Sequence, residues 1–105
     1  MRRLNAELAI MTGTTRTSEG LDARQRKLLF RSWHRGMREM DLILGSFADA
    51  EIGILDEAEL DQYEDLLDIS DSLLLPWITG AQPMPAQHQT GILNKVLAFR
   101  RTMTF

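Results

Sequence analysis

The residues that could carry catalytic or metal-binding chemistry are few in this chain of 105 residues. Cysteine is absent, which excludes a disulfide framework, a thiolate nucleophile and a cysteine-bound metal, and suits the reducing cytosol. His34 and His88 lie far apart in the sequence, and neither has the spacing of an HExxH metal site. The seven glycines are scattered and form no phosphate-binding loop. We therefore expect no enzyme activity, no metal site and no cofactor held by the chain itself.

Charged residues are segregated along the chain. Residues 24–38 hold six bases and no acid, whereas residues 39–71 hold twelve acids and no base. The basic run either forms a face for an anionic partner or attracts acidic neighbours within the molecule. A small helical nucleic-acid-binding protein that uses the 24–38 helix is one hypothesis, and its binding would depend steeply on salt. The acidic block counts against it, because acids repel a phosphate backbone. The six bases are Arg24, Arg26, Lys27, Arg31, Arg35 and Arg38.

Apolar residues recur at intervals of three and four from residue 21 onward, which indicates helices and no strands. We predict an all-α fold, a compact five-helix, bundle-like single domain over residues 21–105, after a flexible N-terminal extension over residues 1–20. Thr17 and Ser18 are start signals for the first helix. Asp56 caps the third helix, and Glu59 completes its capping box. The predicted helices span 21–35, 37–51, a third segment from Asp56 onward, a fourth from Ser70 or Asp71 to Gly80, and 87–101.

The same spacing predicts which side chains are buried. They are Leu29, Phe30 and Trp33 in the first helix, Met37, Met40, Ile43, Leu44, Phe47 and Ala48 in the second, Leu60, Tyr63, Leu66 and Leu67 in the third, Leu74, Trp77 and Ile78 in the fourth, and Ile92, Val96 and Phe99 in the last. No apolar run approaches the roughly 20 residues that cross a bilayer, so we expect no membrane insertion.

One glycine, Gly36, stands between two arginines in the stretch HRGMREMDLILG of residues 34–45. Glycine inside a helix costs about 1 kcal/mol relative to alanine, so this residue either ends a helix or keeps a surface bare. In the first interpretation, it is a left-handed residue that ends the first helix at Arg35. In the second, the corner presents Arg35, Arg38 and Glu39 beside a helix start, and no side chain at position 36 blocks an approaching surface. The residue types alone leave both open.

The stretch RGMRE at residues 35–39 matches the RGxxE signature of the SdhE family of succinate dehydrogenase assembly factors. The longer stretch RSWHRGMREMDLILGSFAD at residues 31–49 resembles that family throughout. A second block, YEDLLDISDSLLLPWITG at residues 63–80, resembles the family's later motif. Together the two blocks and their spacing extend the resemblance over about residues 22–101.

This resemblance implies a five-helix fold and a chaperone-like factor that docks on the flavoprotein subunit of succinate dehydrogenase, with fumarate reductase as an additional candidate client. The factor would promote covalent attachment of FAD, which is the cofactor of the client. The resemblance further implies the cytoplasm for a bacterial protein and the mitochondrial matrix for a eukaryotic one. The family's functional arginine, glycine and glutamate fall on Arg35, Gly36 and Glu39. The expected partner-binding surface consists of Arg35, Gly36, Met37, Arg38, Glu39 and Asp41.

Two positions depart from the family's pattern. Pro76 lies within the fourth helix and removes a backbone N–H donor there, so this helix is expected to kink or to begin late. Ser72 stands where the family commonly has a proline at the start of that helix. Both positions are remote in sequence from residues 35–39, so we expect them to affect local helix geometry alone.

Overall fold

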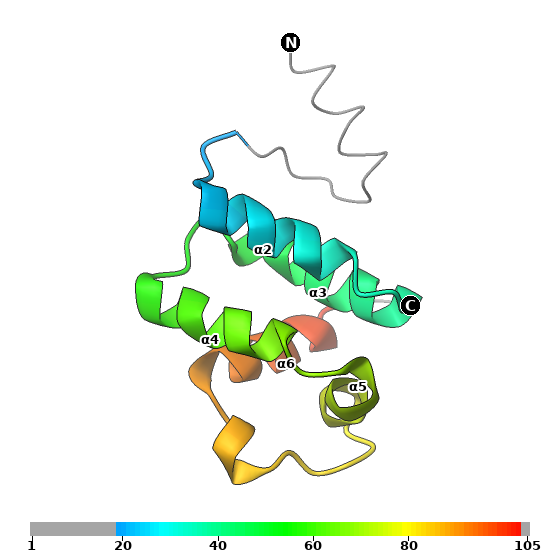
Figure 1. The fold of residues 1–105 in the computed structure, drawn as a ribbon. Coiled ribbons are helices and arrows are strands. Elements are labelled where there is room, and N and C mark those ends of the chain that lie inside the picture. The colour runs from blue at the N-terminus through cyan, green and yellow to red at the C-terminus, as the bar shows by residue number, and fades with distance from the viewer. Residues whose placement is uncertain (1–18, 104–105) are drawn as a thin grey trace. The chain divides into compact units, whose positions relative to one another are not determined.

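A computed structural model describes residues 19–103, and these residues form five α-helices, one 3-10 turn and no strand. The all-α prediction is confirmed over this range. Apart from Glu19 and Gly20, the predicted extension lies outside the described residues. No helix in the described part is long and apolar enough to cross a membrane. The helices are α2 (Ala23–Trp33), α3 (Arg38–Glu51), α4 (Glu57–Leu67), α5 (Asp71–Thr79) and α6 (Gly91–Arg101), and the 3-10 turn is η1 (Ala86–His88) (Figure 1).

The chain divides after Ile54 into two compact units, which are described in turn. The first contains α2 and α3, and the second contains the helices from α4 onward. The assignment of residues 21–105 to one domain stays a prediction.

Helix α2 begins after Asp22, which forms a capping box with Gln25. The Asp22 carboxylate accepts the Gln25 amide at 2.8 Å, and the Gln25 side chain accepts the Asp22 amide at 2.9 Å. This reciprocal pair satisfies two N–H groups that the helix itself cannot bond. The helix therefore begins at Ala23 rather than at residue 21, and Thr17 and Ser18 lie outside the described residues.

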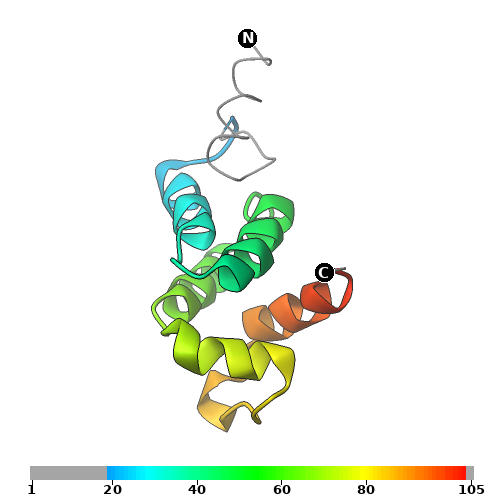
Figure 2. The same cartoon turned by 90° about the vertical axis from the view of Figure 1, so that its right-hand side faces the viewer.

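Helices α2 and α3 run in opposite directions and pack against each other, as Figure 2 shows. The indole of Trp33 lies against Gly45, where three of its ring atoms come within 2.6 Å of the place that a Cβ would occupy. The same indole donates its Nε1–H to the Asp49 carboxylate at 3.1 Å. The Gln25 side chain, in the first turn of α2, donates to the Ile52 carbonyl at 3.2 Å. Side chains from both ends of α2 are thus bonded to the C-terminal end of α3.

Burial in the first unit follows the predicted spacing except at Phe30 and, in part, at Trp33, which is half-buried. The predicted residues of α3 are buried, Met37 at its start is half-buried, and Leu29 in α2 is buried. Phe30 was expected on the apolar side, yet it is 59% exposed. The reason is angular: at roughly 100° per residue, Phe30 lies far round the helix from Leu28, Leu29 and Ser32, which form its buried face.

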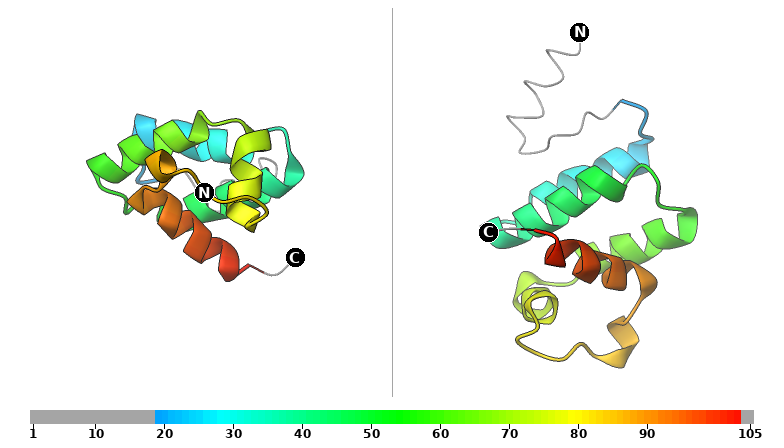
Figure 3. Two further views of the ribbon diagram at one scale, coloured as in Figure 1. Left: turned by 90° about the horizontal axis from the view of Figure 1, so that it is seen from below. Right: turned by 180° about the vertical axis from the view of Figure 1, so that it is seen from behind.

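In the second unit, α6 packs against both α4 and α5, and Figure 3 shows α5 seen almost along its axis beside α6. The predicted capping box of α4 is confirmed: the Asp56 carboxylate accepts the Glu59 amide at 2.8 Å, and Glu59 accepts the Asp56 amide at 3.0 Å. The Gln62 side chain accepts the Ile92 amide at 3.1 Å, and the Lys95 ammonium pairs with the Glu59 carboxylate. These polar contacts join α4 to the first turns of α6.

Helix α5 begins at Asp71 and ends at a left-handed Gly80 (φ +82°), as predicted. The helix does not begin late, and Pro76 lies inside it. The kink expected at Pro76 stays a prediction. The last helix begins at Gly91 rather than at residue 87, because Thr90 caps it by accepting the Leu93 amide at 3.2 Å. The predicted faces of these helices are buried, apart from a half-buried Phe99.

Replacement of Gly45 by alanine is expected to destabilise the protein. The added methyl group would overlap the Trp33 ring, and overpacking of this kind costs about 1 to 3 kcal/mol. Gly91→Ala is the matched control, because its Cβ would meet only the Gln62 Oε1 atom at 3.8 Å. Urea denaturation should show a lower free energy of unfolding for Gly45→Ala alone; equal loss in both variants would contradict the packing described for Trp33.

The ion pair of the second unit predicts a pH dependence. The hydrogen bond from Lys95, followed by that from the Asp56 amide, lowers the pKa of Glu59. A carboxyl whose pKa is lower in the folded state stabilises the fold above its unfolded pKa, and this stabilisation disappears as the pH falls through the folded pKa. The difference in unfolding free energy between the unmodified protein and Glu59→Gln should therefore shrink on acidification from pH 7. A difference that stays constant down to pH 3 would refute the linkage.

Candidate functional site

The connection between α2 and α3 is a tight corner built around Gly36. Gly36 has a φ of +92°, in the left-handed region that glycine adopts without strain, which confirms its predicted conformation. The predicted helix end at Arg35 is wrong. Helix α2 ends at Trp33, because His34 leaves the helical region with φ −128° and ψ 49°. His34 and Arg35 therefore belong to the corner rather than to the helix.

A hydrogen bond across the corner fixes its shape. The backbone amide of Arg35 donates to the Asp41 carboxylate at 2.6 Å. Asp41 lies in the first turn of α3, so this bond fastens the residue before Gly36 to the helix that follows. A hydrogen bond to an ionised acceptor is stronger than one between neutral groups. Asp41, predicted as part of the partner-binding surface, thus also has a structural role.

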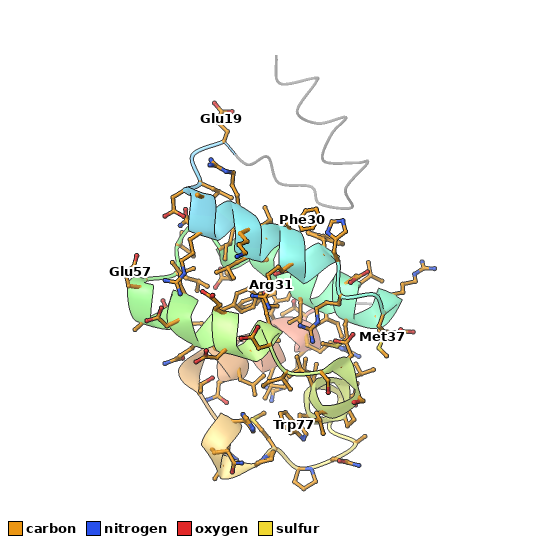
Figure 4. All side chains as sticks on the ribbon, in the orientation of Figure 1. Glu19, Phe30, Arg31, Met37, Glu57 and Trp77 are labelled. Carbon is orange, nitrogen blue, oxygen red and sulfur yellow. The ribbon has the colours of Figure 1, made fainter. Side chains whose placement is uncertain are left out.

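The corner brings the six predicted site residues together, and they differ in exposure. Gly36, Arg38 and Glu39 are exposed, whereas Arg35, Met37 and Asp41 are half-buried. Figure 4 labels Met37 where the corner meets α3. A Cβ at Gly36 would meet no atom within 4 Å, so the glycine faces open space. Over residues 19–103, the side chains of Arg38 and Glu39 make no hydrogen bond or ion pair. We call these six residues the corner surface.

The start of α3 has the electrostatic character of an open helix N-terminus. Met37 occupies the N-cap position and cannot bond the first amides with its side chain. Glu39 and Asp41 lie in the first turn, where negative charge is favourable, but Arg38 adds a cation at the positive end of the helix dipole. Arg38 therefore does not stabilise the helix, and it forms no ion pair within residues 19–103.

Two cavities lie in the second unit, one of about 320 Å³ between α5 and α6 and one of about 290 Å³ beside η1. Neither is lined by a residue of the corner surface. Among residues 19–103, no group of three or more acidic or histidine side chains is placed to hold a metal ion.

Two residues beside the corner were not identified as site candidates from the sequence. Phe30 is exposed and stacks on His34, with ring centroids 3.9 Å apart and planes 14° from parallel. The angular position of Phe30 on α2, away from the buried face, could have indicated that it is exposed. The sequence prediction instead followed the interval of three between Phe30 and Trp33, which is typical of a buried face.

Removal of the Asp41 carboxylate should destabilise the corner. Asp41→Ala leaves the Arg35 amide without its acceptor, and a lost bond of this kind costs about 1 to 3 kcal/mol. Asp41→Asn keeps an acceptor oxygen and should lose less. Urea denaturation gives both values, and amide hydrogen exchange at Arg35 should speed up most in Asp41→Ala. Equal stability of all three proteins would contradict the proposed role of this bond.

Curated relatives of this chain occur in bacteria and in eukaryotes. The chain is 34% identical over 79 residues to the FAD assembly factor SdhE of Acetobacter pasteurianus, with 75% of this chain and 72% of the relative aligned. It is 38% identical over 81 residues to the mitochondrial succinate dehydrogenase assembly factor 2 of Drosophila grimshawi, and 40% identical over 72 residues to that of Dictyostelium discoideum. These alignments cover 75% and 69% of this chain, and it spans about half the length of these two relatives (55% and 51%).

The family model described as the flavinator of succinate dehydrogenase matches residues 26–100, a range that includes every residue of the corner surface. Matches at this level over most of a chain require a common fold and confirm the resemblance carried by the RGxxE motif and its surroundings. The protein therefore belongs to the SdhE family of succinate dehydrogenase flavinators.

Proposed function

We propose that the protein is a non-catalytic assembly factor that docks on the flavoprotein subunit of succinate dehydrogenase and promotes covalent attachment of FAD to that subunit. Membership of the flavinator family and the names of the relatives support this proposal. The corner surface is the proposed docking site. FAD is bound by the client in this proposal, and the factor holds no cofactor of its own.

One observation carries the assignment of the docking site: the side chains of Arg38 and Glu39 make no hydrogen bond or ion pair within residues 19–103. Both are exposed, neither makes a side-chain bond within the described residues, and Arg38 lies at the unfavourable end of a helix dipole. Gly36 beside them faces open space. Charged side chains around a bare backbone are suited to a partner surface that approaches closely, because nothing needs to move aside.

The proposed client also sets the proposed compartment. Succinate dehydrogenase flavoprotein is the primary client, and the flavoprotein of fumarate reductase is a further candidate. The relatives are bacterial and mitochondrial. We therefore place the protein in the cytoplasm if its source is bacterial and in the mitochondrial matrix if it is eukaryotic.

A nucleic-acid-binding function has weaker support. Of the six bases in residues 24–38, only Arg26, Lys27 and Arg38 are exposed. The other three are half-buried and take part in further interactions. Helix α2 therefore does not present a continuous row of cations to a phosphate backbone.

The docking role predicts that Glu39→Ala and Gly36→Arg reduce flavinylation more than stability. Loss of an exposed carboxylate near a helix start costs about 0.3 to 1 kcal/mol, and a side chain in a left-handed conformation costs about 1 to 2 kcal/mol. Each variant is expressed in a strain without its own factor, and covalent flavin on the client subunit is read as in-gel fluorescence. Both should give a large loss of fluorescence, while thermal melts show folded protein.

The controls separate docking from general effects of charge and strain. Asp65→Ala removes an exposed carboxylate from α4, and Gly80→Arg places the same side chain at another left-handed glycine that faces open space. Both controls should support full flavinylation. Full activity of Glu39→Ala would remove the docking role of that carboxylate. If Gly36→Arg and Gly80→Arg unfold alike, Gly36 is needed for the corner rather than for the client.

A further inference from the structure

Phe30 in the last turn of α2 and His34, the residue that follows the helix, form an exposed aromatic pair. Phe30 is 59% exposed and stacks on the His34 ring. The Nδ1 atom of His34 lies 2.7 Å from the Phe30 carbonyl oxygen, and because a carbonyl only accepts, Nδ1 carries the proton. The Phe30 ring thus contacts the His34 ring, and the His34 ring donates a hydrogen bond to the Phe30 backbone. Figure 4 shows Phe30 near the end of α2 that leads into the corner.

The stacking on His34 distinguishes Phe30 from other exposed apolar side chains. Single exposed apolar residues are common and need no explanation, and Ile54 (74% exposed) and Leu73 (55% exposed) are two such cases. An aromatic ring that is already fixed loses less conformational freedom on binding, so more of its apolar contact contributes to affinity. Flat aromatic side chains are also enriched in the cores of protein interfaces.

The charge around the pair indicates what it would contact. Lys27 and Phe30 are three positions apart in α2 and therefore share a face of that helix, and His34, which follows the helix, stacks on Phe30. All three are exposed. The sequence has no acidic residue from Ala23 to Arg38. The face therefore presents a flat apolar area bordered by positive charge, and a complementary surface has an apolar side chain next to a carboxylate.

The pair is continuous with the corner surface. His34 directly precedes Arg35, and both belong to the connection between α2 and α3 within one unit of the structure. Phe30 contacts His34, so the pair adjoins the first residue of the corner surface along the chain. The corner surface alone is small, whereas specific interfaces use about 20 to 30 residues on each side.

We propose that the Lys27, Phe30 and His34 face is a second part of the client-docking site, where the flavoprotein subunit places an apolar side chain flanked by a carboxylate. This inference rests on the proposed function, because it takes the flavoprotein subunit as the occupant. It assigns an apolar anchor to a docking site whose other exposed members are charged residues and a glycine.

The test measures binding of the full chain to the purified flavoprotein subunit of succinate dehydrogenase, immobilised for biolayer interferometry. Phe30→Ala should raise Kd by about tenfold or more, the range expected for an interface anchor. Leu73→Ala is the matched control, since it shortens another exposed apolar side chain, and its Kd should equal that of the unmodified protein. Phe30→Trp keeps a flat apolar ring and should restore tight binding. Thermal melts should be alike for all four proteins.

The outcomes separate this inference from the proposed function. If Glu39→Ala weakens binding while Phe30→Ala does not, the client docks at the corner alone and the inference is wrong. If the unmodified protein does not bind the subunit, both fail. If light scattering shows that the unmodified protein is a dimer and Phe30→Ala a monomer, the pair serves a second copy of the chain, which also overturns the inference. Loss of binding in Phe30→Ala that Phe30→Trp restores, with Leu73→Ala unaffected, supports it.

Discussion

The hydrogen bond from the Arg35 amide to the Asp41 carboxylate closes the corner between α2 and α3, and the arrangement of the site depends on it. Gly36 allows the chain to reverse because it tolerates a positive φ, but that tolerance by itself permits many other conformations. The carboxylate selects one of them. It fixes the residue before the glycine to the helix after it, and so places Arg38 and Glu39 at the surface in one orientation. A short motif can therefore act as a rigid feature without a pocket beneath it.

Local signals were sufficient for much of the fold. The Asp56 capping box and the Gly80 stop operate within a few residues, so their effects are visible in the sequence and are found in the structure. The errors arose where another local signal took precedence: Asp22 began α2 and Thr90 began α6. The candidate site was inferred from its motif and stays a prediction, and the bond between Arg35 and Asp41, which spans six positions, is not implied by that motif. Phe30 was wrongly predicted to be buried, because its interval of three to Trp33 was used and its angular distance from the buried face of α2 was not.

The stretch around the RGxxE motif divides its residues between two tasks. Trp33, Gly45 and Asp49 hold the helices together, and their positions are explained by packing and one hydrogen bond. Arg38 and Glu39 have no such explanation within the described residues. In the proposed function, therefore, only a few residues of this stretch would face the partner, and the others keep the corner in shape. The two acidic residues at the start of α3 are divided in the same way: Asp41 accepts a backbone hydrogen bond, and Glu39 is exposed.

The contact between Trp33 and Gly45 has a consequence for how this sequence can change over time. With the indole in place, position 45 admits only a hydrogen atom as its side chain. A smaller residue at position 33 would vacate that space, and an alanine or serine at position 45 would then be accommodated. Each single step passes through a poorer packing, either a cavity or an overlap, whereas the double change does not. The two positions should therefore vary as a pair among related sequences, with tryptophan at one found together with glycine at the other.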